Sequence, residues 1–395
     1  MRSCRFLALL LVLCLLLPVF AGCGVEEEPS KTGPAKTVVT TQATTAATTE
    51  PPPPVEDAFY SVFDNQDYIK QIGRTRFYYG NLVVDWTASG MEFEYQGYGD
   101  LSIKMEKTGD TKSVALLAVV DGTEHNITVD KQGVNTYSIA TDLPEGVHHV
   151  LIRRKTAVEN AATGRLLTFN EIQMTGRFLE RPADNTYKVA FIGDSITCGV
   201  GVPNYNGLLT YAIDLCTRES FDYDVCSVSG IGVYRSTSKH NGTENTMTKY
   251  YPYFNYYRSV TLPYAPDRKA DLVIVNLNTN DYNTGKSKTA STEEAGYKTA
   301  LRTLISEIRE IHGQNVKIVW VVGMMIDQNA RNNQWLKDVF TELGGESAGL
   351  YRILVATNTS GQDGHPELAS HTAVSKALSA FIREKGLLDL PAAQN

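Results

Sequence analysis

The run Lys188-Val-Ala-Phe-Ile-Gly193 is short, almost wholly apolar and ends at a glycine, and Asp194 and Ser195 follow it directly. An apolar run of this length between turn residues is typical of a strand that is buried on both faces. A serine between such a strand and a helix lies near free backbone N–H groups and is placed like a nucleophile. Taken alone, Gly-Asp-Ser is more typical of a turn or a helix cap, so the interpretation depends on its neighbours.

The pattern around this run recurs toward the C-terminus. Further apolar runs lie at residues 273–277, 316–322 and 350–356, and residues 223–227 are a further predicted strand. Apolar residues at helical spacing lie between them, at 297–311 and 374–382. Strands that alternate with amphipathic helices predict a parallel sheet with helices on both faces, and ligands then bind beyond the carboxyl ends of the strands. We therefore predict an α/β domain over residues 184–395 with its site at that edge.

The preceding region, residues 56–183, has a period of two. Leu101, Ile103 and Met105 alternate with polar residues, and Gly and Asp interrupt such runs at 97, 109–110, 121–122 and 144–146. Short alternating strands with regular turn signals predict an all-β sandwich of the jelly-roll kind.

The N-terminus has the pattern of an export signal. Arg2 and Arg5 form a basic start, the apolar run 6–17 is too short to span a bilayer comfortably, and small residues precede Cys23. We predict a bacterial lipoprotein signal peptide over residues 1–22 and lipidation of Cys23, which would anchor the exported chain to the outer face of a membrane. An ordinary secretory peptide is the alternative. Residues 23–55 are rich in Thr and Pro and predict a disordered linker.

The charge and the cysteine residues limit the classes of ligand that the chain is expected to bind. The formal charge is −7 without basic runs, which is a poor match for nucleic acid and a better one for neutral sugars or esters. No CxxC or HExxH spacing occurs, so we predict no metal site and no cofactor. Cys198, Cys216 and Cys226 remain after the signal peptide and Cys23, and an odd number predicts at least one free thiol.

Polar segments follow several of the predicted strands: Gly193-Asp-Ser195, residues 229–232, residues 278–281, and Asp363-Gly-His-Pro366 before the last helix. One parallel sheet would gather all four at one edge. The ordered set of Ser195, Gly230, Asn280 and His365 resembles the SGNH (GDSL-type) hydrolases. Residues 191–199, the Asp-x-His-Pro segment, and residues 72–75, 84–86, 120–122 and 146–150 of the β-region also resemble carbohydrate esterase family 2. The resemblance covers about residues 73–388.

The resemblance implies a role for each matching residue. Ser195 would be the nucleophile and His365 the general base. The backbone N–H groups of Ser195 and Gly230 and the amide of Asn280 would hold the oxyanion, and losing one such donor typically costs about 100- to 1,000-fold in rate. Asp363 would orient His365, unless a backbone carbonyl does so and Asp363 caps the last helix.

Further residues are secondary candidates. We expect Tyr282 and Trp335 to stack on a sugar ring, although core packing fits Trp335 equally well. The segment of residues 278–281 usually reads Gly-x-Asn-Asp in the hydrolases that it resembles, and Asn278 replaces that glycine. Asparagine tolerates unusual backbone angles, but the substrate cleft would be narrower. His371 is expected on a helix face and not as a second base.

The sequence thus predicts a serine esterase that removes acetyl groups from a plant polysaccharide such as xylan or glucomannan and binds acetylated polysaccharide or oligosaccharide. A lipid or lysophospholipid esterase is one alternative, although the β-region argues for a polymer. An esterase that acts on the acetylated cell wall of the bacterium that makes it is another alternative. A non-catalytic carbohydrate-binding surface protein is the third, and Asn278 alone favours it.

Overall fold

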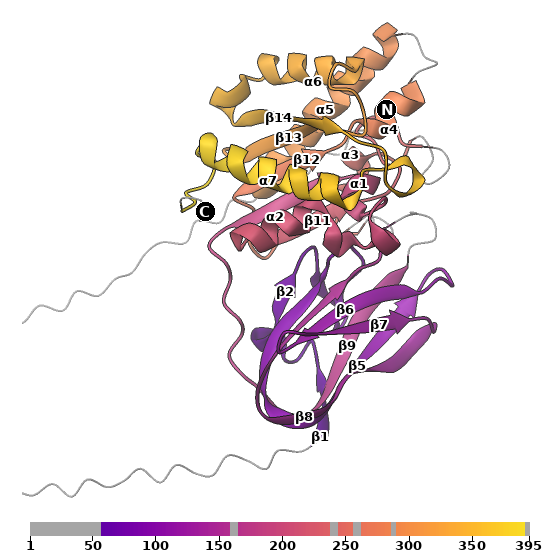
Figure 1. Cartoon of the computed structure of the whole chain (residues 1–395), viewed down its shortest axis with the longest axis vertical. Helices are drawn as coiled ribbons and strands as arrows, with labels where there is room; N and C mark the ends of the chain where they lie inside the picture. The colour runs from indigo at the N-terminus through magenta and orange to yellow at the C-terminus, as the bar shows by residue number, and fades with distance from the viewer. Residues whose placement is uncertain (1–56, 159–164, 238–243, 256–261, 286–289, 392–395) are drawn as a thin grey trace, which may run out of the picture. The chain divides into compact units, whose positions relative to one another are not determined.

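The computed structural model describes residues 57–158, 165–237, 244–255, 262–285 and 290–391 (Figure 1). They form an antiparallel β-domain followed by a five-stranded parallel sheet with helices, which confirms the predicted fold class. The predicted signal peptide, the linker of residues 23–55 and Cys23 lie outside the described residues. Among the helices of the described part, none is both long and apolar enough to cross a membrane.

The β-domain is built from nine antiparallel strands in the order β3-β4-β9-β5-β8-β6-β7, with β1 beside β9 and β2 beside β5. The strands are β1 (Asp57–Ser61), β2 (Lys70–Ile72), β3 (Arg76–Tyr78), β4 (Asn81–Val83), β5 (Gly90–Thr108), β6 (Val114–Val120), β7 (Thr123–Val129), β8 (Gly133–Arg154) and β9 (Leu166–Phe178). Leu101, Ile103 and Met105 are fully buried in the core of this domain, as their alternation predicts.

Two strands are longer than the turn signals predict. β5 continues through Gly97, and β8 continues through residues 144–146, because the pairing of β5 with β8 shifts register near Gly97 and Gly99 instead of stopping. Such bulges bend a strand without ending it. A Cβ on Gly97 would lie 2.1 Å from the carbonyl oxygen of Thr175, so this glycine allows two strands to approach closely. Gly97 and residues 144–146 are therefore not turns.

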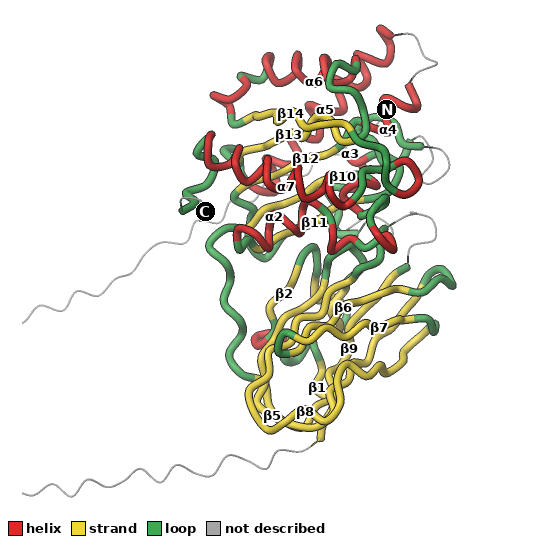
Figure 2. Tube along the Cα trace, in the orientation of Figure 1, coloured by secondary structure: helices red, strands yellow, loops and turns green. Residues whose placement is uncertain are grey.

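The second sheet is wholly parallel, with the strand order β11-β10-β12-β13-β14 (Figure 2). The strands are β10 (Lys188–Gly193), β11 (Asp222–Ser227), β12 (Leu272–Asn276), β13 (Lys317–Met324) and β14 (Leu350–Thr357). The strand order reverses at β10, where β11 lies on one side and β12 on the other. In sheets of this kind the reversal point opens a crevice at the carboxyl ends of the strands.

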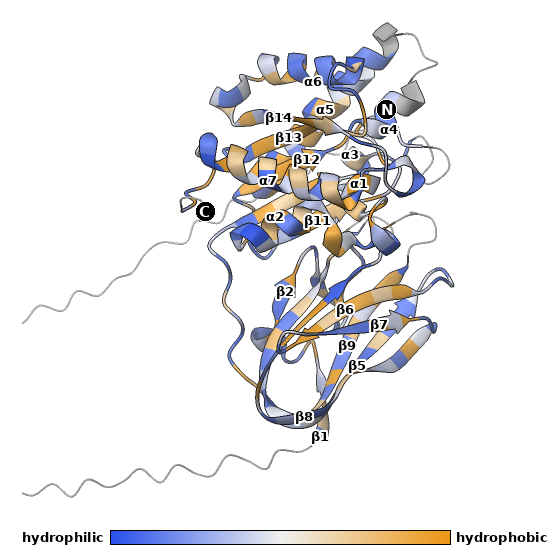
Figure 3. Cartoon of the chain, in the orientation of Figure 1, coloured by the Kyte–Doolittle hydropathy of each residue, from blue (hydrophilic) through white to orange (hydrophobic). Residues whose placement is uncertain are grey.

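Helices cover both faces of the parallel sheet (Figure 1). They are α1 (Ser195–Cys198), α2 (Tyr211–Glu219), α3 (Met247–Tyr250), α4 (Thr279–Gly285), α5 (Ala290–His312), α6 (Arg331–Glu342) and α7 (Leu368–Glu384), with short 3-10 turns at Gln66–Tyr68, Pro203–Tyr205, Gly207–Leu209, Gly345–Ala348 and Gln362–Gly364. Val189 and Phe191 of β10 pack with α2 and α7, whereas Ala190 and Ile192 pack with α5 and α6. Burial on both faces explains why the strands are hydrophobic along their length (Figure 3).

A buried arginine joins the β-domain to the segment that follows α3. Arg74 has no exposed surface, and its Nη2 donates to the carbonyl oxygens of Tyr251 at 2.8 Å and Tyr253 at 2.6 Å. Its Nε donates to the carbonyl of Phe254 at 3.3 Å, which also accepts from Nε1 of Trp86 at 2.9 Å. The guanidinium thus gathers three carbonyl groups and offsets their partial negative charges.

Replacing Arg74 by Lys keeps the charge but removes the planar fork of donors. We expect Arg74→Lys to lower the free energy of unfolding by about 2–4 kcal/mol, because buried carbonyls lose their donors. Urea unfolding measures this. The control is Arg76→Lys, since Arg76 makes an exposed 3.3 Å bond to the carbonyl of Pro263 and should change stability by less than about 0.5 kcal/mol. Equal stability of the two variants would contradict the role given to Arg74.

Candidate active site

A tight turn at the end of β10 places Ser195 at the first position of α1. Asp194 caps this helix by accepting a hydrogen bond from the backbone N–H of Ile196 at 3.0 Å. A Cβ on Gly193 would lie only 1.9 Å from Oγ1 of Thr197, so the turn requires glycine there. Ser195 therefore emerges at the carboxyl edge of the sheet with its backbone N–H at a helix start.

His365 reaches the same edge from the loop before α7. Its Nε2 lies 2.8 Å from Oγ of Ser195, and its Nδ1 lies 3.1 Å from the backbone carbonyl oxygen of Asp363. A carbonyl can only accept, so we assign the proton to Nδ1, which leaves Nε2 free to accept from the serine hydroxyl. Burial lowers the pKa of His365 below its usual value, so the ring is neutral at pH 7 and can take a proton.

The carboxylate of Asp363 points elsewhere. Its Oδ2 accepts a hydrogen bond from the hydroxyl of Tyr205 at 2.6 Å, while the backbone of Asp363 has a φ of 55°. Of the two partners that the sequence left open for His365, the structure places the carbonyl of residue 363 against Nδ1 and not the carboxylate. Sequence reasoning did not find Tyr205, because 158 residues separate it from Asp363 and no motif marks it.

Two backbone N–H groups beside the Ser195–His365 pair belong to residues that the sequence predicts as oxyanion donors. Gly230 follows β11 with a φ of 79°, a conformation that favours glycine, and the N–H of Thr237 holds its carbonyl at 2.9 Å. In the part of the chain that the structure describes, the N–H groups of Ser195 and Gly230 donate to no other group. The oxyanion role predicted for these two positions requires N–H groups that no other acceptor occupies.

Asn280 begins the helix after β12 and is buried beside these donors. Its Nδ2 lies 2.8 Å from the carbonyl oxygen of Ile231 and 3.3 Å from Oδ2 of Asp194. The amide therefore bridges the Gly230 loop and the cap of α1. To serve as the third oxyanion donor it must exchange one of these bonds, and the bond to Asp194 is the longer.

Asp281, the next residue, holds the Gly230 loop, which is formed by residues 229–237. Its carboxylate accepts three backbone N–H groups, from Val233 at 2.9 Å and from Tyr234 and Arg235 at 2.8 Å each. Burial raises the pKa of Asp281 to about 6 and, with the charge of Asp281, the pKa of Asp194 to about 7. Both carboxyl groups brace loops by accepting hydrogen bonds from backbone N–H groups.

Two of the secondary candidates, Trp335 and Asn278, are buried. Trp335 is 8% exposed and packs in the core of α5 and α6 with its ring 5.9 Å from that of Tyr297, which corrects its predicted stacking on a sugar. Asn278 has a φ of 113°, but its side chain is buried and donates to Asn333 at 2.8 Å. It therefore fills the interior and does not narrow the cleft. Tyr282 is half-buried on α4.

The remaining polar candidates are structural. His371 is fully buried on α7, accepts from the backbone N–H of Tyr211 at 3.1 Å, and has its pKa lowered by burial to about 4. Cys198, Cys216 and Cys226 are buried free thiols, in agreement with the odd cysteine count. Within the described ranges, no group of three His, Cys, Asp or Glu side chains is placed to hold a metal ion.

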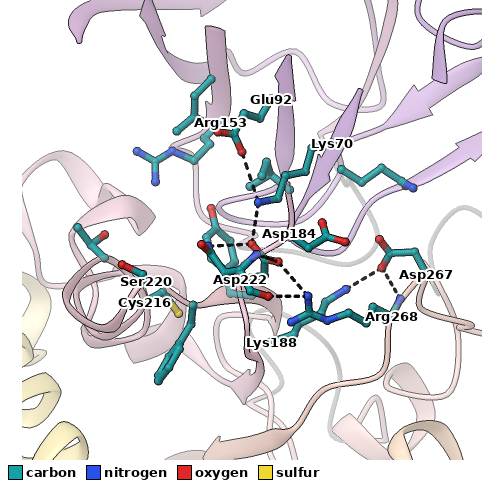
Figure 4. Close-up of a pocket in the computed structure, with 18 residues that line it drawn as sticks. Lys70, Glu92, Arg153, Asp184, Lys188, Cys216, Ser220, Asp222, Asp267 and Arg268 are labelled. Atoms are coloured by element: carbon teal, nitrogen blue, oxygen red, sulfur yellow. Dashed lines mark hydrogen bonds and ion pairs between the residues drawn. The ribbon is translucent and has the colours of Figure 1, made fainter. Parts of the chain in front are cut away.

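A cavity of about 250 Å³ opens at the opposite end of the sheet, where Lys188 begins β10 and Asp222 begins β11 (Figure 4). Two ion pairs lie in its lining: Lys70 binds Asp222 at 2.9 Å and Lys188 binds Asp267 at 2.7 Å. β10 alone separates this end from Ser195 by about 20 Å. The ion pair of Lys70 and Asp222 joins the β-domain to the parallel sheet. The cavity takes no part in the site around Ser195.

Comparisons with known proteins agree with this geometry. Residues 191–383 match the GDSL-like lipase/acylhydrolase family, and residues 71–182 match the N-terminal domain of carbohydrate esterase family 2. The chain therefore belongs to the GDSL (SGNH) hydrolases of carbohydrate esterase family 2.

Several relatives share most of the fold. The cellulase/esterase CelE of Acetivibrio thermocellus is 25% identical over 326 residues, which are 76% of this chain and 37% of that relative. A family two carbohydrate esterase from Clostridium thermocellum, solved with cellohexaose, is 24% identical with a TM-score of 0.68, covering 81% of this chain and all of that one (100%). An acetyl xylan esterase from Butyrivibrio proteoclasticus is 21% identical with a TM-score of 0.72 and coverage of 84% and 100%.

The three bonds to Asp281 predict a loss of rate when that carboxylate is replaced. Asn offers one acceptor oxygen and turns an NH₂ group toward backbone donors, so Asp281→Asn should loosen the Gly230 loop and lower kcat on an acetyl ester by about 10- to 100-fold. The control is Asp214→Asn, which removes only a half-exposed pair with Arg218. An Asp281→Asn enzyme with kcat within twofold of the wild type would show that the loop does not depend on these bonds.

Proposed function

We propose that the protein is a serine esterase that removes acetyl groups from carbohydrate through an acyl-enzyme. The observation that carries this proposal is the 2.8 Å contact between Ser195 Oγ and His365 Nε2 at the carboxyl edge of the parallel sheet. A hydroxyl bonded to a neutral imidazole is the arrangement that serine nucleophiles need. The N–H groups of Ser195 and Gly230 on the adjoining loops have no acceptor among the residues that the structure describes.

The geometry supports a two-step reaction. In the first step Oγ of Ser195 attacks the ester carbonyl carbon while Nε2 of His365 takes the hydroxyl proton. The N–H groups of Ser195 and Gly230 stabilise the negative oxygen, and the imidazolium then protonates the departing sugar oxygen. In the second step His365 takes a proton from water, whose oxygen attacks the acyl carbon. Acetate leaves and Ser195 regains its proton.

The substrate class rests on the relatives and on charge. One structural neighbour was solved with cellohexaose and another is an acetyl xylan esterase, so β-linked plant polysaccharides such as xylan or glucomannan are the proposed substrates. The formal charge of −7 favours neutral polymers over acidic ones.

Acetate release tests the proposal. The panel is acetylated xylan, acetylated glucomannan, acetylated peptidoglycan and aryl esters of short and long chain length. We expect acetate from a plant polysaccharide and a loss of at least about 1,000-fold in Ser195→Ala, with the exposed Ser347→Ala as control.

Other results would contradict parts of the proposal. A preference for long-chain esters would indicate a lipid esterase, and release from peptidoglycan alone would indicate an enzyme of the cell wall. Binding of polysaccharide without acetate release would identify a non-catalytic binding protein. Activity in Ser195→Ala within about tenfold of the wild type would remove Ser195 as the nucleophile.

We further propose that the enzyme works at the outer face of a bacterial membrane, tethered by lipid on Cys23. The support is the basic start, the short apolar run and the small residues before Cys23 in the sequence. Metabolic labelling with a radioactive fatty acid should mark the wild type and not Cys23→Ser, and the variant should lose its membrane association. Equal labelling of both proteins would contradict lipidation at Cys23.

A further inference from the structure

The loop after α1 packs directly against the loop that carries the base. Gly201 has a φ of 100°, and a Cβ on it would lie 2.6 Å from Cβ of His365. The N–H of Gln362 donates to the carbonyl of Gly201 at 3.3 Å. Residues 199–207 therefore form one wall for His365, and only glycine fits at the point of contact.

The same loop reaches the residue that orients His365. The hydroxyl of Tyr205 donates to Oδ2 of Asp363 at 2.6 Å, and the carbonyl of Asp363 lies 3.1 Å from Nδ1 of His365. Asn204, Tyr205 and Asp363 have φ values of 58°, 50° and 55°, in a region that Asn and Asp tolerate but that is uncommon for a bulky residue such as Tyr205. Such conformations persist where surrounding contacts hold them, and they cluster at functional sites.

The β-domain holds the other end of this loop. The N–H of Gly207 donates to the carbonyl of Lys155 at 2.8 Å, and Asn206 forms an isolated antiparallel bridge with Thr156. A Cβ on Gly207 would lie 2.0 Å from Cγ2 of Thr87, so the contact is close. Tyr205 thus lies between a loop fixed to the β-domain and the loop of the base.

We propose that Tyr205 is a positioning residue that holds the Asp363 carboxylate away from His365, so that the carbonyl of residue 363 remains the partner of Nδ1. The β-domain supports the base through this contact. The inference rests on the proposed esterase function for its catalytic meaning, but the hydrogen-bond arrangement can be tested without a substrate.

The choice of partner changes the basicity of the imidazole. A carbonyl oxygen orients the ring without a full charge, whereas a carboxylate against Nδ1 stabilises the imidazolium and raises the pKa of the ring. The titratable neighbours of His365 are Asp363 on its own loop and His371 on α7. Burial lowers the pKa of His371 to about 4, so His371 is neutral near pH 7, and the charged neighbour whose rearrangement the His365 titration reports is Asp363.

The test uses Tyr205→Phe, which keeps the ring and removes the hydroxyl. Side-chain ¹⁵N NMR of the protein, with His365→Gln to assign the signal, gives the pKa of His365 without substrate. The freed carboxylate should turn to Nδ1 and raise this pKa by about 0.5–1 unit. Since the base must be neutral, the acidic limb of kcat/KM should move to higher pH by the same amount.

Two further variants make the result specific. In Tyr205→Phe with Asp363→Asn no carboxylate remains, so the pKa should return to the wild-type value or below it. Tyr79→Phe, at a position 85% exposed on the β-domain, should change nothing. An unchanged His365 pKa in Tyr205→Phe, or a rise that persists in the double variant, would overturn the inference. If the variants show the expected changes in the His365 pKa but the wild type releases no acetate, the proposed function is overturned and the hydrogen-bond arrangement is not.

Discussion

The site depends on one constraint, which is that neighbouring parallel strands end at the same edge of a sheet. Gly193 pairs with both Ser227 and Asn276, so β10, β11 and β12 end level with one another. The loops that follow them carry Ser195, Gly230 and Asn280 only two to four residues later. His365 then needs only a loop from β14 to reach the serine. A register shift in any of these strands would separate the nucleophile from its oxyanion donors.

Buried polar groups fix the loops once the strands have brought them together. Asp194 caps α1 and contacts Asn280, while Asp281 accepts three N–H groups of the Gly230 loop. Burial raises the pKa values of these two acids to about 7 and 6, so their ionised forms cost free energy that the donated hydrogen bonds offset. Near pH 7 Asp281 is mostly ionised, so the Gly230 loop is held by bonds to a charged group, which are stronger than those to a neutral one. The loop that carries His365 is held in a similar way by Tyr205, whose own loop is bonded to the β-domain.

The sequence predicts those features that local pattern encodes. Continuous apolar runs such as 188–192 predict the parallel sheet, and the turn residues after them place the polar segments at one edge. Tertiary features carry no such signal. The carboxylate of Asp363 turns away from His365 because of a left-handed backbone and a tyrosine 158 residues distant. Gly97 has the composition of a turn, yet the strand continues through it as a bulge, and Trp335 is in the core because α6, which carries it, packs on α5.

The central claim is that Ser195 is activated by His365, and covalent trapping tests it most directly. A fluorophosphonate reacts with an activated serine by forming an oxygen–phosphorus bond and releasing fluoride. Peptide mapping by mass spectrometry should locate one phosphonate group on Ser195, formed in step with the loss of esterase activity. The reaction should be at least about 100-fold slower in His365→Ala, because the hydroxyl then has no base. A modified residue other than Ser195, or equal rates in the wild type and His365→Ala, would contradict the account.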